Sequence, residues 1–593
     1  MGLVSLCKKK QYILVDYFGT IVYRTASDAQ IENQWVEYII RKFPSLRERK
    51  LELVKKRKEL YGKMYAGSGE VDFAELCSIY SGWLKEEYNL QTNIKDLCAD
   101  LFDAEVYITG ATQYINKKLY RLLQKEKLKG KKIVLVSDYH LPSKSYSVFF
   151  EFLGLTNFFD AVYISADYNC TNRDGALYQI VLNRLNAKVE EVIMIGDNKI
   201  SDVKNANRMG IDAYHWLSLA FKIKNRCRRF INTKKTAVSV LSKHILSSAD
   251  LSEYGLLLFY FEKQLLKELE IKKAGTINFL SRGGYLLKLL FEKYSKLEGK
   301  KINCNYLYNS RVINHRALNA LKTNTDRVFL NDYTEYMLKH SEDGKLFLVD
   351  EGWNNSSQEM IGQVCNVETY GFYIGTFQKR KIQGICERKG LLFDVRENGS
   401  LSPYYYFFRV NCKTYEQLLQ APHGSIIGMS KNDDGTWAFE ERIDEKESEL
   451  YSRYIKDYQH KIEQVFLMAY YWDSYSEDKE VTLKALVKLV SKNILIFNKN
   501  KNEVLNLFDE CYVDNLAVAN KKERSNTSKM KIEDITLKRM LSEPERLLRY
   551  ITKGQRRYLK RMPIRILYYP VALLYYLYLS LSVNARNFEA KNS

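Results

Sequence analysis

The stretch QYILVDYFGTIVYRT, residues 11–25, decides the fold of this 593-residue chain. Residues 12–15 form a short apolar run, which is long enough for one buried parallel strand. The run ends on Asp16, and a Tyr-Phe-Gly-Thr turn follows. Open α/β sheets bind ligands beyond the carboxyl ends of their strands, so Asp16 is a candidate functional residue. The alternative is a strand that ends in Asp because Asp is a common turn residue.

The composition narrows the class of protein. A chain of this length exceeds a single hydrophobic core, so two or three domains are expected. Ten scattered cysteines without a CxxC pair argue against a disulfide framework and against a structural zinc site. The first ten residues are too short and too weakly apolar for a signal peptide. A net charge of +21 suits anionic lipid, phosphorylated substrates or nucleic acid. Because no base-stacking motif is present, we do not expect a nucleic-acid partner.

Two later predicted strands also end in polar side chains. Residues 133–136 are apolar and lead into Ser137, whose hydroxyl can bind a phosphate oxygen. Residues 192–195 lead into a Gly-Asp turn at Asp197, and Asp202 follows at the start of a helix. Asp197 and Asp202 can approach one divalent cation, and oxygen ligands of this kind suit Mg²⁺.

Between the first two predicted strands, residues 26–110 read as helices. Their apolar residues recur at three- and four-residue spacing. A helical block directly after the first strand predicts a cap over the end of that strand. A plain amphipathic bundle is the alternative.

The three motifs stand in order on successive predicted strands: Asp16 with Thr20, then Ser137, then Asp197 with Asp202. Over about residues 10–220 this order resembles the haloacid dehalogenase superfamily. The resemblance implies a phosphatase domain at residues 1–225, with a helical cap at about residues 26–112.

The same resemblance implies a mechanism. Asp16 would attack phosphorus and form an aspartyl-phosphate, which water then hydrolyses. Thr20 and Ser137 would orient the phosphate oxygens. Mg²⁺, held by Asp16 and Asp197 with support from Asp202, would neutralise charge in the transition state.

Two positions depart from the pattern of the superfamily. Phosphatases of this kind usually carry a second Asp two residues after the nucleophile, and here that residue is Phe18. The usual Lys before the last motif is also missing, and Asn172 or Arg173 takes its place. Arg173 would supply positive charge to the phosphate. General acid catalysis typically contributes about 10²–10⁴-fold. The first domain can therefore be slow, use another acid or be inactive.

A basic and then Ser-rich stretch, residues 222–252, is predicted to connect to a second α/β domain at residues 245–518. A basic, solvated helix face is the alternative for this stretch. This domain opens with a predicted amphipathic helix over residues 254–271. Residues 277–280 then form a strand, and a Ser-Arg-Gly-Gly turn follows at 281–284. A Gly pair between strand and helix lets backbone amides approach an anion. A plain turn between strand and helix is the alternative.

A further strand at residues 346–349 ends in Asp350 and Glu351, and a polar loop follows. The two acids can accept the 2- and 3-hydroxyls of a ribose 5-phosphate, while the loop holds its phosphate. This arrangement resembles phosphoribosyltransferases. Glu351 stands for their second Asp, and Asn355-Ser356 replaces their usual Thr-Gly. The alternative is a structural α/β domain with a polar turn.

The whole chain, over about residues 10–515, resembles the dual-domain ribofuranosyltransferases encoded with bacterial surface-polysaccharide genes. The resemblance rests on a dehalogenase-type module that is followed by four motifs, FLSRGG, YNSR, VDEGW and APHGS. It implies transfer of 5-phosphoribosyl from 5-phosphoribosyl diphosphate to a glycan, which a lipid can carry, and then removal of the 5-phosphate. Asp350 and Glu351 would be catalytic, and His423 and Glu416 would help to recognise the acceptor. The remaining predicted substrate-binding residues are Arg282, Gly283, Gly284, Arg311, Asn355, Ser356 and Ser357.

The rest of the chain is predicted to be mainly helical over residues 430–515, with a linker and a tail at 519–593. In the tail, a basic stretch precedes eighteen uncharged, Tyr-rich residues at 566–583. This is short for a membrane span and better fits a helix at the inner membrane surface. A helix docked on the body is the alternative.

The expected fold class is thus α/β, with two Rossmann-like parallel-sheet domains and a basic C-terminal helical tail. The first domain would be haloacid dehalogenase-like with a cap, and the second phosphoribosyltransferase-like. The expected location is cytoplasmic, at the inner face of the membrane. Two rival functions stay open: a sugar-phosphate phosphatase whose second domain only binds, and a membrane-peripheral assembly protein with degenerate sites.

Overall fold

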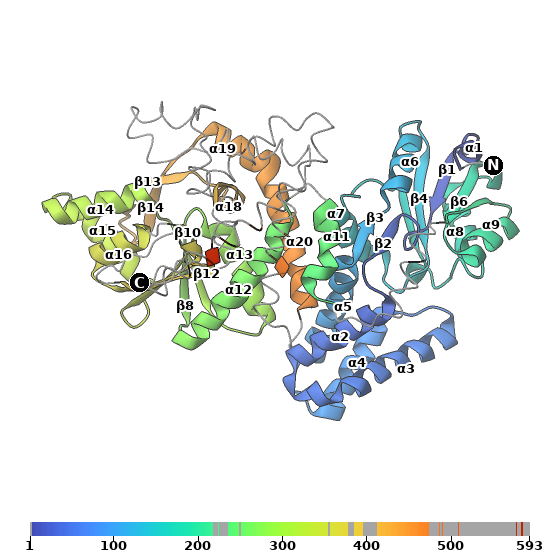
Figure 1. The fold of residues 1–593 in the computed structure, drawn as a ribbon, viewed down its shortest axis with the longest axis horizontal. Helices are drawn as coiled ribbons and strands as arrows, with labels where there is room; N and C mark the ends of the chain where they lie inside the picture. The colour runs from blue at the N-terminus through green and yellow to red at the C-terminus, as the bar shows by residue number, and fades with distance from the viewer. Residues whose placement is uncertain are drawn as a thin grey trace. The chain divides into compact units, whose positions relative to one another are not determined.

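The computed structural model describes residues 3–217, 235–247, 251–353, 356–376, 385–394 and 412–473, with a few isolated positions elsewhere. Its contacts divide the chain into two compact units, and Figure 1 labels many of their elements. The first unit comprises residues 1–247 and 464–482, and the second comprises residues 248–463 and 483–593. Each unit contains a five-stranded sheet of parallel strands. This confirms the predicted α/β fold class.

The sheet of the first unit has the strand order β5-β4-β1-β6-β7, and each neighbouring pair is parallel. The chain builds from β1 to one side and then returns to build the other side, so the strand order reverses between β1 and β6. At such a reversal the loops diverge and leave a crevice at the carboxyl edge. The strands are β1 (Tyr12–Val15), β4 (Lys132–Ser137), β5 (Ala161–Ile164), β6 (Val192–Gly196) and β7 (Asp212–His215).

The three short apolar runs form the three central strands, β4, β1 and β6. A central strand is covered on both faces, so consecutive residues of it are apolar. Ile13, Leu14 and Val15 are fully buried, and Ile13 pairs with Ile133 on one side and Ile193 on the other. Helices accompany the sheet: α1 (Leu3–Cys7), α6 (Lys117–Lys127), α7 (Tyr146–Leu153), α8 (Ala176–Leu185), α9 (Asn205–Arg208) and α11 (Ala237–Ser247).

A helical cap is inserted after β1, between the two strands of an antiparallel hairpin, β2 (Val22–Arg24) and β3 (Gln113–Ile115). Polar residues start its helices. Ser27 forms a capping box with Gln30, and the side chains of Asp72 and Asn93 accept from the first free backbone N–H groups. The cap helices are α2 (Asp28–Lys42), α3 (Lys50–Ser68), α4 (Phe73–Tyr88) and α5 (Ile94–Ala111).

The sheet of the second unit has the order β12-β11-β10-β8-β9, again with parallel neighbours. Here the order reverses between β8 and β10, which places the ends of these two strands at the crevice. The strands are β8 (Thr276–Leu280), β9 (Asn303–Leu307), β10 (Lys345–Trp353), β11 (Glu368–Thr376) and β12 (Ile385–Phe393).

Helices of the second unit connect these strands and follow them. They are α12 (Glu253–Lys272), α13 (Gly284–Leu297), α14 (Arg311–Thr323), α15 (Arg327–Leu338), α16 (Ser356–Cys365), α18 (Cys412–Leu418), α19 (Glu445–Leu450) and α20 (Lys456–Trp472), whose residues from Gln464 onward belong to the first unit.

Two predictions about this unit were wrong in detail. The helix α12 is amphipathic only in its second half, because residues 253–262 are buried on every side. Residues 437–442 form a strand rather than a helix: β14 (Trp437–Arg442) pairs antiparallel with β13 (Ser425–Lys431). The alternating pattern WAFEER and the preceding Asp-Gly turn at 434–435 favour this hairpin.

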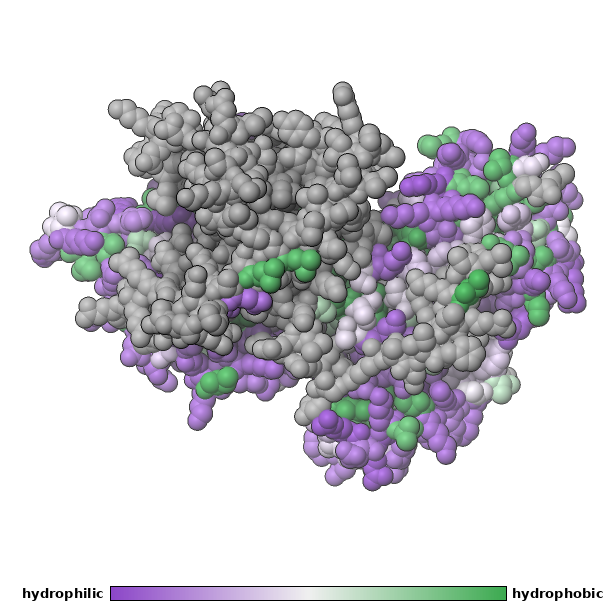
Figure 2. All heavy atoms as spheres, viewed as in Figure 1, coloured by the Kyte–Doolittle hydropathy of each residue, from purple (hydrophilic) through white to green (hydrophobic). Residues whose placement is uncertain are grey.

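About half of the connecting stretch 222–252, and nearly all of the tail 519–593, lie outside the described residues, and the described part of the stretch includes α11. Within the described part of the chain, no helix combines the length and apolar character that crossing a membrane requires. Figure 2 shows a described surface that is mostly hydrophilic on that face, with small hydrophobic patches.

Candidate active site

Asp16 directly follows β1 at the switch point of the first sheet and is 9% exposed. Its N–H donates to the carbonyl oxygen of Ile195 at 2.9 Å, which extends the pairing of β1 with β6 by one residue. The Thr20 hydroxyl donates to Asp16 Oδ2 at 3.0 Å, and the Ser137 hydroxyl donates to Oδ1 at 2.8 Å. The residues predicted from the first two motifs therefore meet at one carboxylate.

The third motif completes a cluster of acids. One ligand oxygen from each of Asp16, Asp197 and Asp202 lies within 4.8 Å of the others. Burial, followed by the charges of Asp202 and Asp197, raises the pKa of Asp16 well above its usual range. A divalent cation would relieve this repulsion, and hard oxygen ligands suit Mg²⁺. The donor set thus fits the predicted cofactor.

Asp202 is held in this cluster by its own turn. The N–H of Asn198 donates to Oδ2 at 2.9 Å, and the Ser201 hydroxyl donates to Oδ1 at 2.7 Å. A Cβ atom on Gly196 would lie 2.1 Å from Oδ2. The glycine that ends β6 therefore leaves the space that this carboxylate occupies.

Phe18 occupies the position where phosphatases of the superfamily usually carry an acid. Its ring packs against Tyr139 with 4.7 Å between ring centroids, and the Arg24 guanidinium lies 4.6 Å over it. Arg24 also forms an ion pair of 2.6 Å with Asp28. The position at which a proton donor is expected is thus occupied by an aromatic ring that packs against Tyr139 and Arg24.

Neither residue in the place of the missing Lys is hydrogen-bonded to Asp16. Asn172 is buried, and its N–H donates to Asp138 Oδ1 at 2.7 Å. Arg173 is exposed, and its guanidinium donates to the Tyr65 hydroxyl on the cap helix α3. The predicted role of Arg173 at the phosphate stays a prediction.

Two groups near this site were given no role by the sequence-based predictions. Asp138 follows Ser137 directly, and a second polar residue at that strand end was the signal for it. The other is a polar network that joins the cap to the loop after β4: Glu105 on α5 lies 3.0 Å from Arg57 and 3.1 Å from His140. No sequence signal marks this network, because its members lie far apart along the chain.

In the second unit, the switch point brings the turn after β8 against the acids of β10. A Cβ atom on Gly283 would lie 1.5 Å from Glu351 Oε2 and 3.1 Å from Asp350 Oδ1. The Glu351 N–H donates to Asp350 Oδ1 at 2.9 Å. Burial, followed by the charge of Glu351, raises the pKa of Asp350 well above its usual range. Gly284 instead packs on Phe279, whose backbone carbon would lie 3.0 Å from an added Cβ atom.

The two predicted arginines of this site differ in environment. Arg282 forms a two-pronged ion pair with Glu447, with N–O distances of 2.7 and 3.3 Å. Arg311 is exposed at the first residue of α14, and its charge partly offsets the raised pKa of Asp350.

The remaining predicted residues have these positions. Ser356 and Ser357 begin α16, and Asn355 lies outside the described residues. His423 Nε2 lies 2.7 Å from the Tyr306 hydroxyl. Glu416 accepts a hydrogen bond of 2.8 Å from the Trp353 indole.

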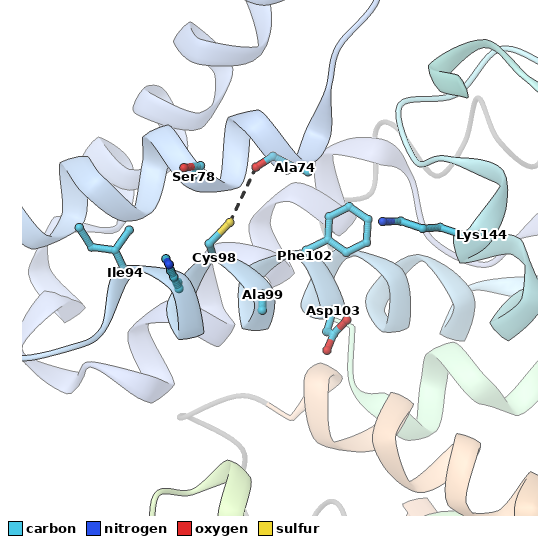
Figure 3. Close-up of a pocket in the computed structure, with 9 residues that line it drawn as sticks. Ala74, Ser78, Ile94, Cys98, Ala99, Phe102, Asp103 and Lys144 are labelled. Atoms are coloured by element: carbon cyan, nitrogen blue, oxygen red, sulfur yellow. Dashed lines mark hydrogen bonds between the residues drawn. The ribbon is translucent and has the colours of Figure 1, made fainter. Parts of the chain in front are cut away.

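A separate pocket of about 360 Å³ lies mainly between cap helices α4 and α5. Figure 3 shows Cys98 directed toward the Ala74 carbonyl and the Lys144 ammonium directed toward the Phe102 ring. No predicted site residue lines this pocket. Its lining residues are Ala74, Ser78, Ile94, Lys95, Cys98, Ala99, Phe102, Asp103 and Lys144.

Comparison with known proteins defines the class of the first unit. Residues 11–210 match the family described as haloacid dehalogenase-like hydrolase. The first unit therefore contains a haloacid dehalogenase-like hydrolase domain, as the motifs predicted. A particular relative is the glyceraldehyde 3-phosphate phosphatase of Methanocaldococcus jannaschii. It is 26% identical over 168 residues, which cover 26% of this chain and 73% of that protein.

Solved structures of low sequence identity also match part of the chain. The 2-haloacid dehalogenase of Pseudomonas syringae is 13% identical, with a TM-score of 0.28, and the match covers 37% of this chain and 100% of that one. The L-2-haloacid dehalogenase of Xanthobacter autotrophicus is 17% identical, with a TM-score of 0.25, over 37% of this chain and 82% of that one.

Proposed function

We propose that the first unit is a phosphatase that works through a covalent aspartyl-phosphate at Asp16. One observation carries this proposal: the buried Asp16 carboxylate accepts hydroxyls from Thr20 and Ser137 and lies in a cluster with Asp197 and Asp202. The named phosphatase relative supports it.

In this mechanism an oxygen of Asp16 attacks phosphorus, and the bond from phosphorus to the leaving oxygen breaks. Thr20 and Ser137 hold the carboxylate before attack and are placed to donate to phosphate oxygens. When bound, Mg²⁺ would keep the acids ionised and neutralise charge on the phosphoryl group. Water then attacks the phosphorus of the aspartyl-phosphate, which releases phosphate and restores Asp16.

For the second unit the proposal is transfer of 5-phosphoribosyl from 5-phosphoribosyl diphosphate to a glycan acceptor. The close approach of Gly283 to Asp350 and Glu351 at the switch point supports it. The acids would bind the ribose hydroxyls, and the glycine turn would face the diphosphate. Arg282 and Arg311 would stabilise the departing diphosphate. The resemblance to dual-domain ribofuranosyltransferases also supports this reading.

The two proposed activities belong together because the transfer creates a phosphomonoester that the first unit would hydrolyse. The product would be a ribofuranosyl residue in a surface polysaccharide such as an O-antigen or a capsule. A lipid-linked acceptor would be met at the inner face of the membrane, where the basic tail would bind.

The test uses the full chain with Mg²⁺, 5-phosphoribosyl diphosphate and candidate glycan acceptors, followed by mass spectrometry. We expect a ribosyl adduct without phosphate from the wild type. Asp16→Asn should leave a phosphoribosyl adduct, and Asp350→Asn should leave the acceptor unchanged. If no acceptor is modified and the donor does not bind, the transferase part is wrong.

The rivals predict other outcomes of the same test. A phosphatase whose second domain only binds would release phosphate from ribose 5-phosphate without modifying any acceptor. An assembly protein with degenerate sites would do neither. The Arg282–Glu447 ion pair is the observation that favours a non-catalytic second unit, because it occupies an arginine that the transferase needs.

A further inference from the structure

Asp138 is an acid beside the first site that the mechanism above does not use. It follows Ser137, whose hydroxyl touches the nucleophile. The N–H of Asn172 donates to its Oδ1 at 2.7 Å and holds the side chain in place. The structure shows no hydrogen bond to its other oxygen, Oδ2, from any described residue, and the Asp138 side chain is only half-buried. One oxygen is thus fixed, while the other has no hydrogen-bond partner among the described residues.

The charged groups that influence Asp138, or that Asp138 influences, include one of the acid cluster and one of the cap. The charge of Asp202 acts on Asp138 from the cluster. On the other side, the charge of Asp138 acts on Glu70, which stands between cap helices α3 and α4. The leaving group of a phosphate attacked by Asp16 would point away from the nucleophile toward the cap. Because Asp138 follows Ser137 at the carboxyl end of β4, we expect it to border the space that this group would enter.

Other titratable groups near Phe18 are engaged elsewhere. The Tyr139 hydroxyl is 3.4 Å from Thr109, and burial raises the pKa of this tyrosine well above its ordinary value. His140 is paired with Glu105 in the polar network that joins the cap to the loop after β4. Glu70 interacts with the side chain of Ser165.

We infer that Asp138 is the general acid and base of the first unit, in place of an acid at position 18. The inference rests on the proposed phosphatase function. As Asp16 bonds to phosphorus and the bond to the leaving oxygen breaks, the proton of Asp138 moves to that oxygen and the alcohol leaves. The Asp138 carboxylate then takes a proton from the water that attacks phosphorus. The bond from phosphorus to Asp16 breaks, which gives phosphate, ionised Asp16 and protonated Asp138.

The environment of Asp138 suits this exchange of a proton. Burial raises the pKa of Asp138 to about 6, and the charges of Asp202 and Asp174 act in the same direction. The Asn172 N–H and the charge of Arg173 oppose them. An acid that titrates near neutral pH can both give and take a proton.

The test compares two substrates of the full chain with Mg²⁺. Ribose 5-phosphate has an alkoxide leaving group, which must be protonated as it departs. The leaving group of p-nitrophenyl phosphate is nitrophenolate, which departs without a proton. For Asp138→Asn we expect kcat/KM on ribose 5-phosphate to fall by about 10²–10⁴-fold, and on p-nitrophenyl phosphate by less than about threefold. Because the second step loses its base, kcat should fall on both substrates, with a burst of nitrophenolate.

Asp174→Asn is the matched control. It removes a neighbouring exposed carboxylate whose Oδ1 accepts from the Ala176 N–H at 2.9 Å. Because the Asp174 charge acts on the pKa of Asp138, both rates can change slightly, but we expect the ratio of kcat/KM on the two substrates to stay that of the wild type. In the Asp138→Asn background, Phe18→Asp should restore much of the lost activity on ribose 5-phosphate. If that double variant does not fold, the assignment of Asp138 is tested by the single variant Asp138→Asn, through its different losses of kcat/KM on the two substrates.

Equal kcat/KM losses on both substrates, or no loss on ribose 5-phosphate, would overturn the assignment of Asp138 while leaving the phosphatase proposal intact. A folded wild type that hydrolyses neither substrate would overturn both.

Discussion

The backbone of Gly19 lies directly against the carboxylate of Asp197, since a Cβ atom at position 19 would be 2.7 Å from Asp197 Cγ. Gly19 also has a φ of +85°, a backbone conformation that residues with a Cβ atom rarely adopt. We therefore expect Gly19→Ala to displace Asp197 and to lower phosphatase activity by about 10²-fold. The loss of activity is measured as the rate of phosphate release from ribose 5-phosphate in the presence of Mg²⁺.

Gly130→Ala is the control for backbone strain. Gly130 has a φ of +86°, but an added Cβ atom would meet nothing within 4 Å. Both variants should lose about 1–2 kcal/mol of stability, and only Gly19→Ala should lose activity. Equal activity losses would mean that strain, and not contact with Asp197, explains the glycine.

The Glu105 carboxylate stabilises the cap through Arg57 and His140. Removing one partner of a buried ion pair typically costs about 3–5 kcal/mol, so Glu105→Gln should be strongly destabilising. Burial alone would raise the pKa of Glu105, but Arg57 and His140 lower it to about 2. A depressed pKa adds stability that is present above the unfolded value of about 4.3 and is lost as the pH falls toward the folded value.

Urea titrations of the wild type and Glu105→Gln therefore have a defined pH dependence. Their difference in unfolding free energy should be constant above about pH 4.3 and shrink toward pH 2. Glu59→Gln is the control, because Glu59 forms an exposed pair with Lys63 on α3 and should change nothing measurable. A difference that does not vary with pH would contradict a role for the ionised carboxylate.

Glu351 is expected to cost stability in the free protein. Its Oε2 is buried and has no hydrogen-bond partner among the described residues, and it lies beside Asp350. Glu351→Gln should raise the melting temperature by the equivalent of about 0.5–2 kcal/mol and weaken binding of 5-phosphoribosyl diphosphate. Calorimetry measures both.

Glu342→Gln is the matched control for Glu351→Gln in the same unit. Glu342 accepts hydrogen bonds from the N–H groups of Gly275 and Thr276, so its loss should lower the melting temperature. If Glu351→Gln also lowers it and donor binding is unchanged, Glu351 has a structural role only.

Glu262 is fully buried on α12, and neither carboxylate oxygen has a hydrogen-bond partner in the part of the chain that the structure describes. Burial raises the pKa of Glu262 well above its usual range. The folded state therefore keeps a proton that the unfolded state releases above about pH 4.3, so wild-type stability falls as the pH rises toward the folded pKa. Glu262→Gln should be more stable than the wild type at neutral pH.

Chemical denaturation across pH 4–8 checks this prediction. The advantage of Glu262→Gln should grow from about pH 4.3 upward and level off above the folded pKa of Glu262. An advantage that is constant over this range would contradict it.

The central strands and the first site were accessible from the sequence because their signals are local. An apolar run that ends in Asp16, Ser137 or a Gly-Asp turn predicts a buried strand and a polar strand end. Parallel strands bring such ends to one edge of a sheet, so the meeting of Asp16, Ser137 and Asp197 followed from pattern alone. The hairpin at 425–442 was not predicted, although residues 437–442 alternate, because the longer stretch 430–515 that contains them is mainly of helical pattern.

Other features depend on contacts between residues far apart in the sequence. Local signals were enough to predict the α/β class, the strand ends, the inserted cap and the absence of an acid at position 18. The fold was needed to show that Asp138 is held by Asn172 beside the site, that Glu105 joins Arg57 to His140, and that Gly283 leaves space for Glu351. Periodicity and turn chemistry act over a few residues, whereas the packing of loops and side chains depends on which distant segments the fold brings together.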